Sequence, residues 1–170
     1  MKTLFLLLIA YFFVMFFITR LVVPNLTFWK SKLPEKIPPN ITKEIQKLKK
    51  SLKNRKDFLE KAFESVGKRY SHSFAGSIIR CDKAFKTDLE KIWNEKGQYQ
   101  TCNVRNYLLR VILVKSGYFK NDEIMPTAAF MNFSLHQYLL VKIDGKWTRA
   151  DPWAYNMGIK LGQKTPLFMI

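Results

Sequence analysis

Two segments of the sequence carry residue types that together perform nucleophilic chemistry in many proteins. The segment "LHQYLLVKIDGKWTRADPW" holds His136 near its start and Asp151 near its end, and "TCNVRNYLLRVILVKSGYF" begins with Cys102 beside a threonine. A cysteine thiolate attacks a carbonyl carbon, a histidine transfers the proton, and a carboxylate orients the imidazole. The three residues therefore predict acyl-transfer chemistry, provided that the fold brings their side chains together.

The segment around His136 has the pattern of an antiparallel β-hairpin. The pair Asp144-Gly145 stands between two β-rich runs, which is typical of a tight turn, and Pro152 ends the returning strand. With the turn centred on this pair, Val141 faces Thr148 across the hairpin.

The same register sets the relation between the histidine and the aspartate. Tyr138 faces Asp151, and His136 lies two residues from Tyr138 on the same face. Diagonal neighbours have Cβ atoms roughly 7 Å apart, close enough for an imidazole and a carboxylate to hydrogen-bond after a small adjustment. The register thus predicts a contact between His136 and Asp151, which a slip of one residue would abolish.

The second segment predicts a buried helix that ends at Gly117, because its apolar residues cover more than one face. Cys102 falls at or just inside the first turn, with Thr101 or Asn103 as the capping residue. Free backbone N–H groups and the helix dipole stabilise a thiolate at such a position. The apolar residues that define this helix include Val104, Leu108, Val111 and Ile112.

The other cysteine and the other histidine are expected to have no chemical role. Cys81 precedes an amphipathic helix predicted from about Asp82 to Glu95, and we interpret it as a structural residue. His72 lies in the polar stretch "KRYSHSFAG" and is expected to be an exposed surface or loop residue. Two cysteines and two histidines match no disulfide framework or zinc motif, and no glycine-rich phosphate loop occurs, so neither a metal nor a cofactor is indicated. The helix predicted from about Asp82 to Glu95 would carry these apolar residues near one face: Ala84, Phe85, Leu89, Ile92 and Trp93.

Residues 1–23 predict an uncleaved membrane anchor. The chain is free of charge from Thr3 to Thr19, and the apolar run extends to Val23 if Arg20 snorkels, which gives the ~20 residues that a bilayer core requires. A cleaved signal peptide is the alternative, but no small-x-small site follows the run. Positive charges flank both ends and mildly favour a cytoplasmic domain, whereas an uncleaved signal anchor usually places it outside. We therefore expect a single-pass membrane protein and favour an extracytoplasmic domain.

Two further segments precede a domain that spans residues 71–170. Residues 24–40 contain three prolines and predict an extended spacer, and residues 41–70 predict one basic amphipathic helix or two. The whole chain carries a formal charge of +16. The basic helical segment either packs its apolar stripe on the domain or lies on an anionic membrane surface beside the anchor. Its apolar residues are Ile41, Ile45, Leu48, Leu52, Phe58, Leu59, Ala62 and Phe63.

The order of these elements resembles the transglutaminase-like superfamily of papain-fold proteins. The cysteine that starts a buried helix and the segment "H-x-[hydrophobic]…DG-x-W-x-x-x-D-P" carry the resemblance, which covers about residues 81–153. It implies an α+β, papain-like core with helices packed on a small antiparallel sheet. Cys102 would be the nucleophile, His136 the general base and acid, and Asp151 the orienting residue. The chain departs from the family by lacking a small residue before the cysteine and any calcium-binding carboxylate cluster, so calcium activation is not implied.

The function implied by the resemblance is acyl transfer or amide hydrolysis on a protein or peptide substrate, through a thioester. Two alternatives stay open: a catalytically inactive membrane-anchored binding module that uses the cleft for recognition, and a basic protein that binds membrane surfaces. No specific nucleic-acid partner is expected, and the sequence does not indicate an oligomeric state. Candidates for oxyanion donors and cleft walls are Gln98, Gln100, Trp93, Tyr138 and Trp153.

Overall fold

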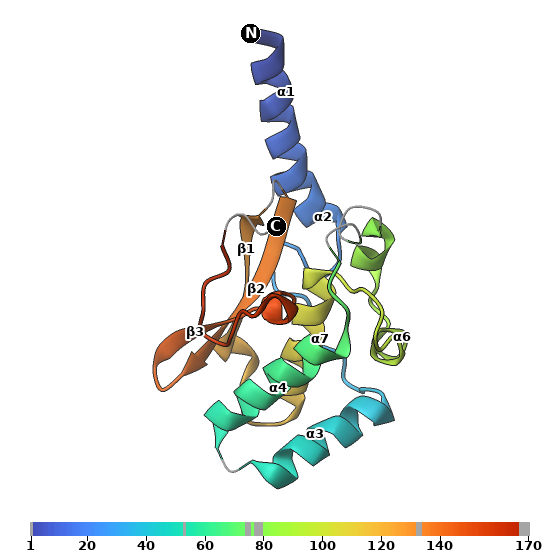
Figure 1. Cartoon of the computed structure of the whole chain (residues 1–170), viewed down its shortest axis with the longest axis vertical. Helices are drawn as coiled ribbons and strands as arrows, with labels where there is room; N and C mark the ends of the chain where they lie inside the picture. Colours follow the sequence, from blue (N-terminus) through green and yellow to red (C-terminus); the bar gives the residue numbers. More distant parts are fainter. Residues whose placement is uncertain (1, 53, 74–75, 77–79, 132–133, 167–170) are drawn as a thin grey trace.

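An apolar N-terminal helix leads into an α+β domain, in which helices pack on a three-stranded antiparallel sheet (Figure 1). The computed structural model describes residues 2–52, 54–73, 76, 80–131 and 134–166. The mixed α+β class predicted from the sequence is confirmed over these residues. The elements in chain order are α1 (Lys2–Phe13), the π-helical η1 (Val14–Ile18), α2 (Thr19–Val22), α3 (Pro39–Ser51), α4 (Arg55–Arg69), the 3-10 helix η2 (Cys81–Phe85), α6 (Leu89–Asn94), α7 (Cys102–Lys115), the 3-10 helix η3 (Asn121–Glu123), β1 (Ile124–Met131), β2 (Ser134–Ile143), β3 (Lys146–Ala150) and the 3-10 helix η4 (Ala154–Met157).

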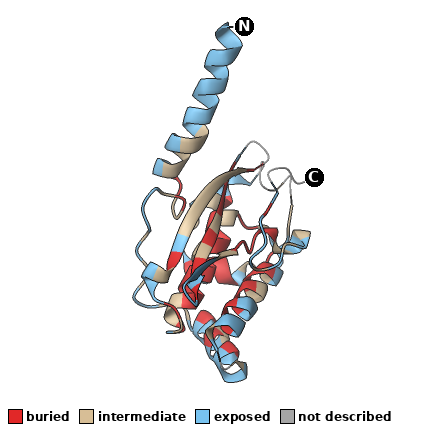
Figure 2. Cartoon of the chain, turned by 90° about the vertical axis from the view of Figure 1, so that its left-hand side faces the viewer, coloured by how far each residue is buried: buried red, intermediate tan, exposed pale blue. Residues whose placement is uncertain are grey.

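The N-terminal apolar segment is one continuous helical stretch made of α1, η1 and α2. It runs from Lys2 to Val22, and its 21 residues are long and apolar enough to cross a membrane, a test that signal sequences also pass. Most of its large apolar side chains are exposed, and Figure 2 shows α1 projecting from the domain. The segment predicted from hydropathy is therefore helical over its apolar length.

The basic segment forms two helices, α3 and α4, and both contribute to the main core. Asn54 begins α4, because its side chain accepts a hydrogen bond from the Asp57 N–H at 2.8 Å. The apolar stripes predicted from the spacing are buried in the same hydrophobic cluster as the residues of α7 and β2. The interpretation in which this stripe packs on the domain is confirmed.

The position of α3 contradicts the membrane-surface interpretation of this segment. Figure 1 shows α3 at the end of the domain opposite α1, and its apolar residues Ile41 and Ile45 are 0% and 3% exposed. A helix whose apolar face is buried in the core, at the far end from the N-terminal helix, cannot lie in the same membrane surface beside that helix.

The prediction of a single helix from about Asp82 to Glu95 is wrong. The chain forms the short η2, runs extended through Lys86, and starts α6 at Leu89. The break arises at Asp88, whose carboxylate accepts hydrogen bonds from the N–H groups of Glu90 and Lys91 and so caps a new helix. As a result Phe85 is half-exposed, whereas the apolar residues of α6 are buried in the main core.

The hairpin of β2 and β3 has the predicted register. Val141 pairs with Thr148 and Ile143 pairs with Lys146, and the turn lies at Asp144-Gly145. Asp144 adopts a φ of 49° there, in the left-handed region that aspartate tolerates better than most residues. The apolar residues of α7 named above are fully buried, and α7 packs on β2, the central strand.

Gly67 provides a test of the contact between α4 and the C-terminal segment. A Cβ atom at this position would lie 2.4 Å from Cγ of Tyr155, so Gly67→Ala should push the tyrosine ring away. We expect a loss of about 1–3 kcal/mol in the free energy of unfolding, although alanine favours the helix itself. Urea denaturation measures this, with Glu60→Ala on the exposed face of α4 as a control within about 0.5 kcal/mol of wild type.

Candidate active site

His136 and Asp151 form a buried hydrogen-bonded pair. Nε2 of His136 lies 2.7 Å from Oδ2 of Asp151, and the two residues are 3% and 2% exposed. His136 belongs to β2, and Asp151 directly follows β3, so the hairpin register brings them together diagonally. The contact predicted from the sequence is confirmed.

The C-terminal segment holds the Asp151 carboxylate in place. The hydroxyl of Thr165 donates to Oδ2 at 2.5 Å, and the guanidinium of Arg149 lies 3.5 Å from the same oxygen. The Ala154 N–H donates to Oδ1 at 3.4 Å. Sequence reasoning missed Thr165, because its distance of 14 residues from Asp151 in a segment without strands gives no register to follow.

Cys102 reaches the same strand from the start of α7. The β2–β3 ladder ends at the pair Leu139–Ala150, so the following stretch of β2 has no β3 partner. The N–H of Gln137 there donates to Sγ of Cys102 at 3.4 Å. Thr101 occupies the N-cap position but makes no side-chain capping bond, so the cap expected there is not formed. Cys102 thus lies against the residue next to His136 in sequence.

The charges at the site stabilise an imidazolium. Burial alone would lower the pKa of His136, but the Asp151 carboxylate and a hydrogen bond with Cys102 raise this pKa to about 10. Burial would raise the pKa of Asp151, but His136, Thr165 and Arg149 hold it below its ordinary value. Since Nε2 faces Asp151, the other ring nitrogen, Nδ1, is the one left for the sulfur. A thiolate on Cys102 and an imidazolium on His136 stabilise each other in this geometry.

The ring of Trp153 packs against the imidazole of His136. Trp153 is buried and its ring lies 5.1 Å from the ring of His136, centroid to centroid, and the ring of His72 lies 4.9 Å from that of Trp153. Trp153 therefore belongs to the site, as the cleft interpretation proposed. His72 lies in a loop, as expected, but it is half-buried rather than exposed, and its buried Nδ1 has no hydrogen-bond partner among the described residues.

Arg105 is a buried cation that sequence reasoning missed. It is 0% exposed, and its guanidinium donates to the carbonyl of Gln100 at 3.1 Å, to that of Pro152 at 3.5 Å and to that of Ser71. These carbonyls lie just before Cys102, just after Asp151 and just after α4, so Arg105 joins three chain segments. The available signal was an arginine within a helix predicted to be buried.

The side chains of the oxyanion and cleft candidates, with the exception of Trp153, contact groups other than the cysteine. The amide of Gln100 donates to Glu95, and Gln98 Oε1 accepts from Lys83 at 3.3 Å. Trp93 lies in the main core beneath the Arg69 guanidinium. Tyr138 stacks under Arg149 at 3.5 Å from the ring centroid. Ion pairing and core packing engage these side chains elsewhere, and none of the four lines the cavity described next.

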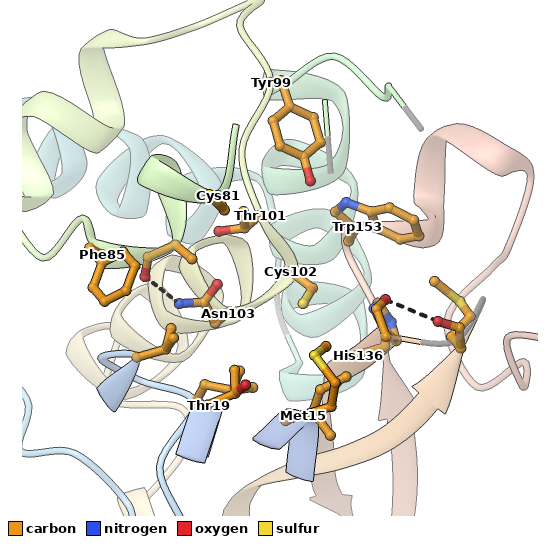
Figure 3. A pocket seen from close by; sticks show the side chains of 16 residues that line it. Met15, Thr19, Cys81, Phe85, Tyr99, Thr101, Cys102, Asn103, His136 and Trp153 are labelled. Carbon is orange, nitrogen blue, oxygen red and sulfur yellow. Dashed lines mark hydrogen bonds between the residues drawn. The ribbon is translucent and has the colours of Figure 1, made fainter. Parts of the chain in front are cut away.

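An apolar cavity of about 250 Å³ opens beside Cys102 and His136 (Figure 3). Leu135 and Met131 from the sheet line it, and so does Cys81, which is exposed rather than buried. The expectation of a purely structural Cys81 is therefore wrong in its premise, since burial was the reason for it. The cavity gives an apolar group access to the sulfur of Cys102.

Comparisons with known proteins give no match to a family model, to a curated protein or to a solved structure. The geometry supplies a cysteine at a helix start, a histidine on a strand and a carboxylate hydrogen-bonded to that histidine.

The two histidines should titrate on opposite sides of the ordinary imidazole pKa of about 6.5. His136 should titrate at about pH 10, whereas burial and the nearby Arg105 lower the pKa of His72. Two-dimensional NMR of the imidazole nuclei measures both. Asp151→Asn should lower the pKa of His136 and leave the pKa of His72 unchanged, because the substitution removes the charge that favours the imidazolium of His136.

The raised pKa of His136 also makes the stability of the protein depend on pH. Because the pKa of His136 is higher in the folded state, its contribution to the free energy of unfolding is complete below about pH 6.5 and is lost as the pH rises toward 10. A titration of His136 at or below that of His72 would contradict the charge arrangement.

Proposed function

We propose that this chain is a cysteine-dependent acyltransferase or amide hydrolase of the transglutaminase-like type, with a papain-like core. The observation that carries the proposal is the meeting of Cys102 from the start of α7, His136 from β2 and Asp151 from the position directly after β3. This supports the roles that the residue pattern implies: nucleophile, proton carrier and orienting carboxylate.

The first step is acylation of the cysteine. The thiolate of Cys102 attacks the carbonyl carbon of the donor and forms a C–S bond. The imidazolium of His136 gives its proton to the leaving nitrogen or oxygen as the bond from that atom to the carbonyl carbon breaks. Asp151 stays ionised and balances the imidazolium before this transfer.

The second step releases the acyl group. Water or an amine loses a proton to the neutral His136 and attacks the thioester carbonyl, and the sulfur departs as thiolate. Hydrolysis and transamidation differ only in this acceptor. A protein or peptide substrate is what the residue resemblance implies.

Two groups at the start of α7 support stabilisation of the oxyanion. The backbone N–H of Cys102 lies in the first turn of α7, where N–H groups lack intrahelical partners. The hydroxyl of Thr101 lines the cavity, is buried and has no hydrogen-bond partner among the described residues. These replace Gln98, Gln100 and Trp93 as candidates.

The N-terminal helix is proposed to anchor this enzyme as a single-pass membrane protein. Its length and apolar composition support a span. We keep the extracytoplasmic side as the favoured location of the domain, on the usual topology of an uncleaved signal anchor.

Alkylation tests the activated nucleophile. Iodoacetamide at about pH 6 should modify Cys102 faster than Cys81, although Cys81 is the more exposed, because a helix start and an adjacent histidine activate a cysteine as a nucleophile. Mass spectrometry of the two peptides over time gives both rates. Faster modification of Cys81, or an unchanged Cys102 rate in His136→Ala, would contradict the pairing of sulfur and imidazole.

Turnover of p-nitrophenyl acetate tests the catalytic roles. Cys102→Ser and His136→Ala should lower kcat/KM by on the order of 10²-fold or more, and Asp151→Asn by a similar factor. Asp144→Asn, in the exposed hairpin turn, is the matched control and should keep the wild-type rate, since asparagine also tolerates positive φ. A wild-type rate in Cys102→Ser would leave a binding module as the function of the cleft.

A further inference from the structure

The N-terminal helix forms one wall of the cavity beside the candidate nucleophile. Met15 and Thr19 of the helical stretch line the cavity, and so does Val23, the extended residue that directly follows the helix. Figure 3 shows Met15 and Thr19 on the side of the cavity opposite Tyr99, with Cys102 and His136 between. The helix that is proposed to enter the membrane therefore also borders the active site.

Hydrogen bonds fix this helix relative to the catalytic pair. Nδ2 of Asn103 donates to the carbonyl of Pro24 at 2.9 Å, and Nε2 of Gln137 donates to the carbonyl of Asn25 at 2.7 Å. Asn103 follows Cys102 and Gln137 follows His136, and both are buried. The neighbours of the nucleophile and of the proton carrier thus hold two consecutive carbonyls just beyond the helix.

Apolar packing continues this contact along the helix. Val23 and Leu26 form a buried cluster with Leu135 of β2. Farther along the helix, the ring of Phe130 in β1 lies 5.5 Å from that of Phe12 and 6.0 Å from that of Phe16. The end of the hairpin formed by β1 and β2 therefore lies alongside the apolar helix rather than below it.

The length of the helix sets the depth of the cavity in a bilayer. Its 21 residues span about 31 Å at 1.5 Å per residue, close to the ~30 Å hydrocarbon core. Val22 then lies near the membrane surface, and Met15 lies about 10 Å deeper along the helix axis. The helix-side wall of the cavity falls within the hydrocarbon, where a hydrophilic peptide would lose its hydration without compensation.

We infer that the acyl donor is a membrane-embedded acyl lipid, whose hydrocarbon chain lies in the cavity between Met15, Val23 and Leu135 with its ester carbonyl at Cys102. The inference rests on the proposed function and names its substrate class. The small, mostly apolar cavity suits one hydrocarbon chain. The N-terminal segment must be retained for this role, because its removal would delete a wall of the cavity.

The chemistry balances for an ester donor. Sγ of Cys102 bonds to the carbonyl carbon, the ester C–O bond breaks, and the departing alcohol oxygen takes the proton from His136. Water then cleaves the thioester, so that one ester and one water give one fatty acid and one alcohol. No other reactant is needed.

Chain-length preference of the full-length protein in detergent micelles tests the inference. We expect Cys102-dependent hydrolysis of p-nitrophenyl dodecanoate with a kcat/KM at least about tenfold above that of p-nitrophenyl acetate, because the added methylenes bind the apolar cavity. Release of p-nitrophenolate gives the rates, and the intact mass of the acylated protein identifies the thioester.

Variants that fill the cavity separate chain binding from catalysis. Val23→Phe should lower the dodecanoate-to-acetate ratio by about tenfold or more. Val22→Phe is the matched control, because Val22 is 59% exposed and does not line the cavity, and its ratio should stay at the wild-type value. If Val23→Phe does not fold, Met15→Trp with the control Val14→Trp makes the same comparison in the helix itself. Each substrate partitions into the micelles equally for all variants, so partitioning does not affect the comparison of their dodecanoate-to-acetate ratios.

The outcomes distinguish the inference from the proposed function. Acetate turnover that depends on Cys102, with no preference for dodecanoate, or with an equal loss of both rates in the cavity variants, overturns the lipid substrate and leaves the cysteine chemistry standing. An absence of Cys102-dependent turnover with both esters overturns both.

Discussion

The buried hydrogen bond between His136 and Asp151 is the interaction on which the rest of the site depends. Burying a carboxylate or an imidazolium alone costs much free energy. The two groups are therefore buried together, and their remaining hydrogen-bond donors and acceptors need partners as well. The C-terminal segment meets this need, since Trp153 covers the imidazole and Thr165 donates to the carboxylate. The segment that follows β3 thus shields the pair from solvent.

The helix α7 acts as the frame that joins the other segments to this pair. Its polar side chains are buried, yet they point to backbone carbonyls of distant segments: Asn106 to Gln137 at 2.6 Å, Arg110 to Ser31 at 2.7 Å, and Asn103 to Ala84 at 2.8 Å. Carbonyl groups of loops need such partners when they are buried. The same side chains that satisfy the loops therefore fix where Cys102 begins the helix.

The parts of the site that follow from local rules could be predicted from the sequence. The Asp144-Gly145 turn determines the register, and the register determines the contact between His136 and Asp151. The meeting with Cys102 required a residue pattern, because 34 positions separate it from His136 and no local rule spans them. Partners formed by tertiary packing were not predictable. They are the contact of His72 with Trp153, the bonds of Arg105 to three chain segments, and the Glu95 and Lys83 contacts that occupy Gln100 and Gln98. Asp88 is a residue type that often caps a helix, so the sequence held a local signal for the break before α6. The prediction gave more weight to the helical spacing of the apolar residues.

The carbonyls of Pro24 and Asn25, held by Asn103 and Gln137, link the depth of the helix to the geometry of the cleft. Such a linkage is reciprocal, so any force that favours one helix position also favours the matching arrangement of Cys102 and His136. A bilayer exerts such a force through its hydrophobic thickness, since a helix that is too long or too short for the hydrocarbon tilts or shifts. In the proposed enzyme, membrane thickness would therefore act as an effector of catalysis.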